Sequence, residues 1–127
     1  MDKRKKRVLV IDDNPDMRRT MQALLESEGF AVSVAADGEE ALRLQRERPA
    51  AVVITDIFMP GKEGIETIFE LRKQFPQTKI IVMSGGSRAT GMDYFDVARE
   101  LGAVKALKKP FAPEELIDAV RELTASD

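Results

Sequence analysis

The stretch AVVITDIFMPGKEG, residues 51–64, decides how the rest of this sequence folds. Its first residues, AVVI, are apolar without alternation, which is typical of a parallel strand that is covered on both faces. Pro60, Gly61 and Gly64 prevent that strand from continuing. Asp56 is therefore expected at the carboxyl end of a buried strand, the edge of an open parallel sheet where the departing loops diverge and ligands bind.

Similar apolar runs occur elsewhere in the chain and also stop at polar residues. They predict strands over residues 8–11, 79–83 and 104–107, and an alternating run predicts a strand over 30–35. The polar residues that follow the first three runs are Asp12 with Asp13, Ser84, and Lys109 after Lys108. Because all of these residues follow strands, we expect them and Asp56 at one edge of one sheet.

Apolar side chains at helical spacing fill the intervals between the strands. Helices are predicted over residues 17–28, 39–46, 63–74 and 94–101, and from residue 113 onward. Asn14 or Asp13 is expected to cap the first helix with Pro15 in its first turn, and Asp37 with Gly38 is expected to form a turn. Because strands and helices alternate with short connections, the predicted fold class is α/β, a single parallel sheet between helix layers.

Length and composition fit one domain over residues 1–127, since 43% of the residues are hydrophobic. The chain has no cysteine and no histidine, which excludes disulfides, thiol chemistry and the commonest zinc sites. A net charge of -2 gives no general attraction to nucleic acid, and the basic run KRKKR at residues 3–7 is interpreted as a solvated lead-in. No apolar stretch approaches the roughly 20 residues of a membrane span and no signal peptide is apparent, so we expect a cytoplasmic protein.

Three carboxylates, those of Asp12, Asp13 and Asp56, are expected in one small crevice, where they repel one another unless a cation is present. Oxygen ligands without histidine or cysteine suit a hard ion, so the sequence predicts a Mg²⁺ site. Mg²⁺ commonly joins carboxylates to phosphate oxygens, and Lys109 and the hydroxyl of Ser84 are suitable partners for a phosphoryl group. The chemistry that these residues indicate is phosphoryl transfer.

With these residues, essentially the whole chain resembles the receiver domain of two-component response regulators, of the CheY-like, stand-alone type. The family's paired acids fall on Asp12 and Asp13, its phosphoacceptor on Asp56, its hydroxyl on Ser84 and its lysine on Lys109. Also matching the family pattern are Met59, Pro60 and Gly61 after the acceptor, and Pro110 after the lysine. The resemblance implies a flavodoxin-like (βα)5 three-layer sandwich whose parallel strands lie in the order 2-1-3-4-5.

The resemblance also implies how the acidic residues act. Asp56 is the nucleophile that accepts a phosphoryl group from a phosphohistidine. Asp13 and Asp56 bind Mg²⁺ directly, Asp12 binds it through water, and the backbone carbonyl of Phe58 completes the protein's share. The expected partners are a sensor histidine kinase or histidine phosphotransfer protein and a downstream protein target, with no membrane and no direct nucleic acid binding.

Lys109 is expected to supply a fixed positive charge to the phosphoryl group, aimed inward by a cis peptide bond to Pro110. The hydroxyl of Ser84 is expected to move toward that group and draw in the loop that begins with Gly85 and Gly86. The chain is not expected to be an enzyme beyond its own phosphorylation and dephosphorylation. It is expected to be a monomer or a phosphorylation-dependent dimer.

One position departs from the usual family pattern. The residue three positions before the lysine is commonly aromatic in the family, and here it is Ala106. The usual relay by a rotating ring is therefore absent from the predicted switch. Phe58 and Gly86 resemble the positions that govern access of water to the acyl phosphate, so its lifetime is expected to depend on them.

Other interpretations stay open. A pseudo-receiver that binds partners without phosphorylation is the least economical alternative, since the acids, the hydroxyl and the lysine are all present, but Ala106 keeps it open. A Mg²⁺-dependent phosphohydrolase needs a general acid, but Phe58 occupies the position two residues after Asp56. A flavin-binding electron carrier needs a glycine- and hydroxyl-rich phosphate loop after the first strand, where the sequence reads DDNP at residues 12–15. A stand-alone receiver and a receiver cut from a longer regulator both fit the sequence.

Overall fold

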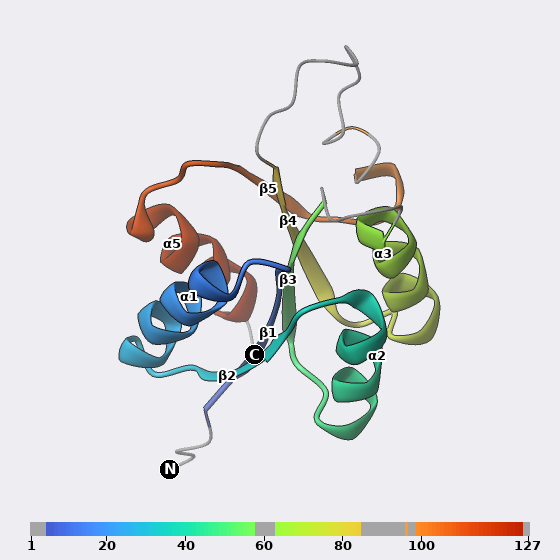
Figure 1. The fold of residues 1–127 in the computed structure, drawn as a ribbon, viewed down its shortest axis with the longest axis horizontal. Coiled ribbons are helices and arrows are strands. Elements are labelled where there is room, and N and C mark those ends of the chain that lie inside the picture. Colours follow the sequence, from blue (N-terminus) through green and yellow to red (C-terminus); the bar gives the residue numbers. More distant parts are fainter. Residues whose placement is uncertain (1–4, 58–62, 85–95, 97–98, 126–127) are drawn as a thin grey trace.

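The computed structural model of the chain describes residues 5–57, 63–84, 96 and 99–125. At its centre is one sheet of five parallel strands (Figure 1). The strands are β1 (Arg7–Ile11), β2 (Ala31–Ala35), β3 (Val52–Asp56), β4 (Lys79–Ser84) and β5 (Lys105–Lys108). They lie in the order β2-β1-β3-β4-β5, so the predicted α/β class and flavodoxin-like strand order are confirmed.

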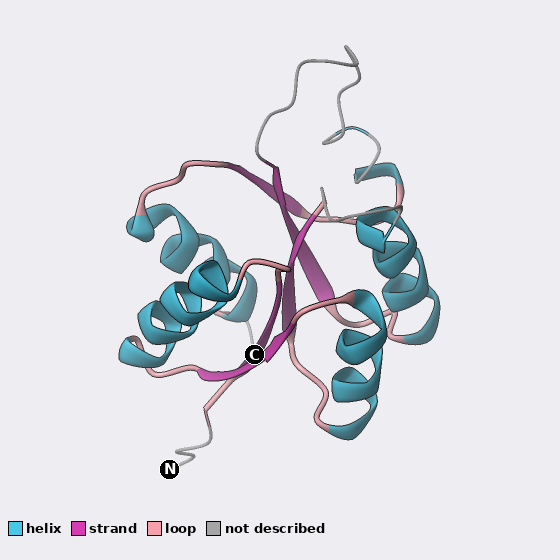
Figure 2. Ribbon diagram, viewed as in Figure 1, coloured by secondary structure: helices cyan, strands magenta, loops and turns pink. Residues whose placement is uncertain are grey.

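Helices cover both faces of the sheet. They are α1 (Pro15–Ser27), α2 (Gly38–Glu47), α3 (Glu63–Gln74) and α5 (Pro113–Thr124). α1 and α5 lie on one face, and α2 and α3 lie on the other, as Figure 2 shows. None of the helices in the described ranges is both long enough and apolar enough to cross a membrane.

The helix predicted over 94–101 is only partly covered by the described residues. Asp96, Arg99 and Glu100 are helical, whereas residues 94, 95, 97 and 98 lie outside the described residues. Leu101 and Gly102 then form a turn, and Gly102 has a φ of +110°, in the region that favours glycine. The glycine stop predicted for this helix therefore coincides with a turn that requires a positive φ.

The ends of several elements differ from the prediction by a residue or two. Phe30 precedes β2 and Val104 precedes β5, so both strands begin one residue later than their apolar runs. α1 is capped by Asn14, not Asp13, because the Asn14 side chain accepts hydrogen bonds of 2.8 and 3.1 Å from N–H groups of the first turn. Asp37 likewise caps α2, and Gly38 is the first residue of that helix rather than part of a turn.

Burial on both faces explains why β1, β3 and β4 are apolar without alternation over most of their length. All five side chains of β3 are buried. Val52 and Ile54 pack with the apolar side chains of α1 and α5, whereas Val53 packs with those of α2 and α3. The strand therefore contributes to both halves of the core, and only its last side chain, that of Asp56, carries a charge.

The buried side chain of Gln45 forms hydrogen bonds at the amino-terminal edge of the sheet, the edge opposite Asp56. The side-chain amide of Gln45 on α2 donates to the backbone carbonyl of Ala50 at 3.0 Å and to the hydroxyl of Thr78 at 2.9 Å. Its carbonyl oxygen accepts from the N–H of Ala50 at 2.9 Å. Because Ala50 precedes β3 and Thr78 precedes β4, one fully buried side chain joins α2 to the entrances of both strands.

The Gln45→Leu substitution is expected to destabilise the fold by roughly 3 kcal/mol, since it leaves the two groups of Ala50 and the Thr78 hydroxyl buried without their partner. Urea unfolding monitored by circular dichroism measures the loss. The matched control is Gln22→Leu on α1, whose amide donates a hydrogen bond to the exposed Glu26, and it should change stability by less than about 0.5 kcal/mol. Equal effects of the two substitutions would contradict this account of the edge.

Candidate functional site

The strand register brings the predicted polar residues to one edge of the sheet. Ile11 is paired with Thr55, and Asp56 is paired with Met83, so β1, β3 and β4 end side by side. Ser84 is in turn paired with Lys108, the residue before Lys109. The ends of four strands that are separated in sequence therefore meet, as the sequence predicts for open parallel sheets.

Asp12, Asp13 and Asp56 form a cluster at this edge. Each offers a carboxylate oxygen, and these oxygens all lie within 4.8 Å of one another. Asp12 and Asp56 are only 1% and 6% exposed, whereas Asp13 faces solvent. The cluster thus combines two carboxylates held inside the protein with a third at the surface, and all are acidic oxygen donors of the kind that hard divalent cations prefer.

The ammonium of Lys109 lies against the two buried carboxylates. Its Nζ is 2.7 Å from Oδ2 of Asp56 and 3.2 Å from Oδ2 of Asp12. The backbone N–H of Lys109 donates to the carbonyl of Ser84 at 2.7 Å, which fixes the start of this segment to the end of β4. The bond between Lys109 and Pro110 is cis, as predicted.

The pKa of Lys109 reflects two opposing influences. Its partial burial favours the neutral amine, but the hydrogen bonds and negative charges of Asp56 and Asp12 outweigh that effect, so its pKa is raised above the ordinary lysine value. Lys109 is therefore an ammonium throughout the physiological pH range. One ammonium balances only part of the negative charge of three carboxylates, so a divalent cation would be attracted to the cluster.

Asp12 is held from its backbone as well as from its side chain. Its Oδ1 accepts from the N–H of Asn14 at 2.9 Å, and its carbonyl accepts from Nη1 of Arg18 at 2.8 Å. Arg18 is a part of the site that sequence reasoning missed. Its guanidinium bonds to a main-chain carbonyl, and such a contact leaves no pattern of complementary charges in the sequence.

Ser84, the predicted hydroxyl ligand, is the last residue of β4 and is 4% exposed. It therefore lies at the same edge as the acidic cluster. The other predicted members of the site, Phe58 with its backbone carbonyl and the pair Gly85 and Gly86, lie outside the described residues. Their assignment stays a prediction.

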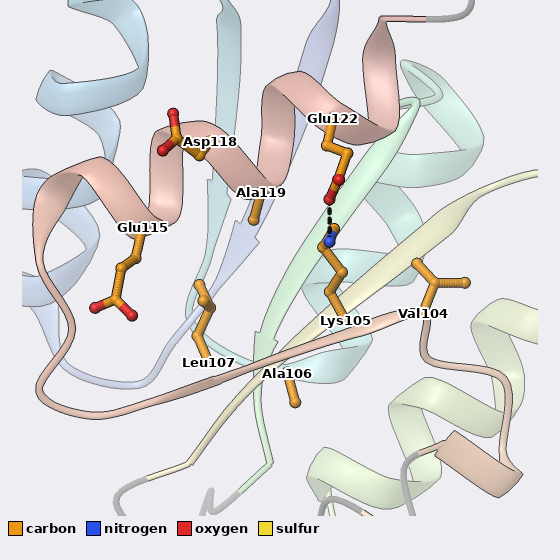
Figure 3. A pocket seen from close by; sticks show the side chains of 8 residues that line it. All are labelled: Val104, Lys105, Ala106, Leu107, Glu115, Asp118, Ala119 and Glu122. Carbon is orange, nitrogen blue, oxygen red and sulfur yellow. Dashed lines mark ion pairs between the residues drawn. The ribbon is translucent and has the colours of Figure 1, made fainter.

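Ala106 lies on β5, paired with Val82 of β4. Figure 3 shows its short side chain on the opposite side of the strand from Leu107, which points toward α5. Ala106 packs against the core beneath α2 and α3, whereas Leu107 belongs to the core beneath α1 and α5. No ring extends from this position, so any change at Ser84 has to reach the surface by another route.

Between β5 and α5 lies a hollow of about 590 Å³, which Figure 3 shows from close by. Lys105 and Glu122 form an ion pair across it. Glu115 and Asp118 also line the hollow from α5 and are exposed. This surface is therefore polar and predominantly acidic, and it is distinct from the acidic cluster at the strand ends.

The comparison with known protein families agrees with the geometry of the strand ends. The model of the response regulator receiver domain matches residues 8–121. The chain belongs to the response regulator receiver family. Receiver domains support phosphoacceptor roles in two-component signalling and generally bind Mg²⁺ at an acidic pocket, and the three aspartates of this receiver domain form a cluster that fits such an ion.

Curated relatives and solved structures give the same assignment. The receiver is 38% identical over 117 residues to the transcriptional regulatory protein CpxR of Klebsiella pneumoniae, covering 92% of this chain and 48% of CpxR. It is 39% identical over 127 residues to the probable transcriptional regulator ycf27 of Cyanophora paradoxa, covering 97% of this chain and 50% of that protein. The chain thus spans about half the length of these curated relatives.

Among solved structures, the receiver is similar to the chemotaxis protein CheY4 of Vibrio cholerae. The TM-score is 0.85 at 29% sequence identity, and the match covers 94% of this chain and 99% of CheY4. This likeness covers nearly the whole chain. It supports the strand order and the edge at which the acidic cluster lies.

The Asp13→Asn substitution is expected to stabilise the metal-free receiver by about 1 kcal/mol. It removes one of three mutually repelling carboxylates, and the ion pairs of Lys109 are with the other two, those of Asp12 and Asp56. In saturating Mg²⁺ the wild type should instead be more stable than the variant, since the wild type gains binding energy that the variant largely lacks. Thermal unfolding with a chelator and then with Mg²⁺ measures both signs. Asp118→Asn, on the exposed face of α5, is the control and should respond to Mg²⁺ as the wild type does.

Replacing Lys109 by Met is expected to lower the free energy of unfolding of the metal-free receiver by about 1–3 kcal/mol at neutral pH, since two buried carboxylates lose a charged hydrogen-bond donor. Because the pKa of Lys109 is raised in the folded state, its contribution is complete below about pH 10.4, the value in an unfolded chain. It disappears as the pH rises through the folded-state pKa. The gap between wild type and variant should therefore close only in strongly alkaline solution.

Chemical unfolding of both proteins at a series of pH values measures this gap. Lys108→Met is the matched control, because Lys108 is the adjacent lysine and is exposed. The Lys108→Met substitution should change the free energy of unfolding only slightly, and by the same amount at each pH. A gap for Lys109→Met that closes near neutral pH would contradict the raised pKa.

Proposed function

We propose that this receiver takes a phosphoryl group from a phosphohistidine onto Asp56, with Mg²⁺ bound beside it, and thereby changes its contacts with other proteins. The observation that carries the proposal is the position of Lys109, whose Nζ lies 2.7 Å from Asp56 Oδ2 within a cluster of three carboxylates. An ammonium fixed beside one carboxylate oxygen is suited to meet the negative oxygens of an incoming phosphoryl group.

In the proposed reaction, a carboxylate oxygen of Asp56 attacks the phosphorus of the phosphohistidine in line with the phosphorus–nitrogen bond. The new oxygen–phosphorus bond forms as that bond breaks, and the imidazole leaves with the electron pair and is protonated by solvent. Lys109 binds a phosphoryl oxygen and keeps its charge throughout, because its pKa lies far above neutrality. Asp13 and Asp56 would hold Mg²⁺ directly and Asp12 would hold it through water, and the ion would supply further neutralisation of the phosphoryl oxygens.

An apolar groove next to the cluster supports a protein as the phosphodonor. The groove has a volume of about 490 Å³ and lies between α1 and the segment that leads into α5. Its lining residues are Met17, Thr20, Met21, Leu24, Lys109, Pro110, Phe111 and Pro113. Lys109 lines this groove and also contacts Asp56, so the groove is adjacent to the acidic cluster and within reach of a protein donor whose histidine approaches Asp56. We propose that an apolar helix face of the donor binds there.

The proposed output depends on Ser84. Its hydroxyl can meet a phosphoryl oxygen at the same strand edge and shift the segment that follows. Moving a population from 1:99 to 99:1 requires about 5.5 kcal/mol of preference for the active form, which a few charge-assisted hydrogen bonds can supply. The downstream partner is proposed to be a protein, and the receiver is proposed to act as a monomer or as a phosphorylation-dependent dimer.

Incubation with Mg²⁺ and acetyl phosphate is expected to add one phosphoryl group to the wild type, detected by intact mass, and none to the Asp56→Asn variant. The variant removes the nucleophile and keeps the size of the side chain. Asp118→Asn serves as the control, since this exposed carboxylate on α5 belongs to no group of carboxylates that could hold a metal ion among the described residues.

Other outcomes favour the alternatives. A wild type that stays unmodified under conditions in which other receivers are phosphorylated would support the pseudo-receiver. Continued turnover of small phosphate esters without an adduct would support the phosphohydrolase. Retention of flavin by the purified protein would support the electron carrier.

The docking groove predicts a difference between protein and small-molecule donors. Thr20→Glu places a charge at an exposed position in the apolar groove and should slow phosphotransfer from a sensor histidine kinase at least tenfold, a cost of about 1.4 kcal/mol. Its reaction with acetyl phosphate should be unchanged, because the acidic cluster is intact. Ala23→Glu, exposed on the same helix but outside the groove, is the matched control. The kinase used is one shown to phosphorylate the wild type.

A further inference from the structure

Arg18, on the first turns of α1, directs its guanidinium at the backbone of the acidic cluster. Its Nη1 donates to the main-chain carbonyl of Asp12 at 2.8 Å, and the side chain is half-buried. No acidic side chain within the described ranges forms an ion pair with it. The adjacent Arg19 differs, because its guanidinium is exposed and pairs with Asp16. Arg18 is therefore committed to the backbone of the site, whereas Arg19 is an ordinary surface cation.

The carbonyl that Arg18 binds belongs to the peptide group joining Asp12 to Asp13. The backbone N–H of Asp12 donates to the backbone carbonyl of Ala35 at 3.1 Å, and the Asp12 carboxylate accepts from the ammonium of Lys109. Both contacts hold Asp12 in place. Asp13 is different: among the described residues, its carboxylate has no hydrogen-bond or ion-pair partner. The orientation of Asp13 is consequently set through its backbone, and Arg18 holds the peptide plane immediately before it.

We infer that Arg18 is a positioning residue for this site. By fixing the peptide between Asp12 and Asp13, it keeps the exposed carboxylate of Asp13 within 4.8 Å of those of Asp12 and Asp56, where a divalent cation can be shared. The inference rests on the proposed function, since it assigns Arg18 to the Mg²⁺ site of the phosphoacceptor. Groups that orient metal ligands commonly change metal affinity by about 10- to 100-fold when they are lost.

The sign of the effect separates positioning from simple electrostatics. Loss of a positive charge near a cation site, with no other change, strengthens cation binding because a like charge has been removed. Loss of a positioning contact weakens binding because the ligands no longer converge. The Arg18→Met substitution removes both the charge and the hydrogen-bond donor while keeping an unbranched apolar stem, so the two roles predict opposite changes in Mg²⁺ affinity.

The test is calorimetric titration of Mg²⁺ into metal-free wild type, Arg18→Met, Arg18→Lys and Arg19→Met. Arg18→Met is expected to raise the dissociation constant for Mg²⁺ about tenfold. Arg18→Lys keeps a charged donor and should recover part of the affinity. Arg19→Met removes the same charge from the next residue and should stay within about twofold of the wild type, as expected for a screened surface charge. Circular dichroism in a chelator establishes that each variant is folded.

Equal or tighter binding of Mg²⁺ by Arg18→Met would overturn the assignment of Arg18. If Arg18→Met does not fold, Arg18→Lys is compared with Arg19→Lys: both keep the charge, so weaker Mg²⁺ binding by Arg18→Lys alone supports positioning, and equal binding by the two variants overturns it. Phosphorylation of the wild type at Asp56 by acetyl phosphate is measured in parallel. Failure of the wild type to bind Mg²⁺ or to be phosphorylated removes the proposed function together with this inference, whereas a normal wild type with an unaffected Arg18→Met removes the inference alone.

Discussion

The repulsion between three carboxylates that share one small space is the constraint on which this structure depends. Asp12, Asp13 and Asp56 place acidic oxygens within 4.8 Å of one another, and Lys109 neutralises only part of that charge. Such an arrangement is costly in the absence of a cation. It is stable here because a rigid sheet, two buried hydrogen-bonded carboxylates and a fixed ammonium hold it together. The same excess of negative charge makes the edge receptive to a divalent ion.

The rest of the fold keeps that edge in place. β3 is buried on both faces and ends at Asp56, so the position of the Asp56 side chain is set by a strand that packs in both halves of the core. Gln45 fixes the opposite ends of β3 and β4 through hydrogen bonds to the residues before them. Lys109 connects the site to the apolar groove beside α1. The acidic cluster, the core and the apolar groove are therefore structurally connected.

The strand ends could be predicted from the sequence because a parallel sheet leaves a clear pattern. Largely apolar runs that give way to polar residues, at Asp12, at Thr55 with Asp56, at Ser84, and at Lys108 with Lys109, indicate both the strands and the edge at which they meet. Element ends were less predictable, since they depend on single hydrogen bonds. Either Asn14 or a neighbouring residue could cap α1, and only the geometry distinguishes them.

Two polar residues show what sequence patterns leave out. Gln45 is a polar residue on the buried face of α2, and it is tolerated there because its amide satisfies backbone groups that no sequence pattern identifies. Arginine is most often a surface residue, yet the guanidinium of Arg18 donates to the backbone carbonyl of Asp12 in the site. Both act on main-chain atoms that are present at every position, so only the three-dimensional fold shows which atoms they reach.

Crystals grown with Mn²⁺ in place of Mg²⁺ provide the most direct measurement of the central claim, because the anomalous signal of manganese locates the ion independently of the refined coordinates. A single strong peak is predicted between the carboxylates of Asp13 and Asp56, at about 2.1 Å from an oxygen of each, the distance expected for a small octahedral cation. A peak elsewhere on the protein, with the three aspartates at the strand ends left without metal, would contradict it.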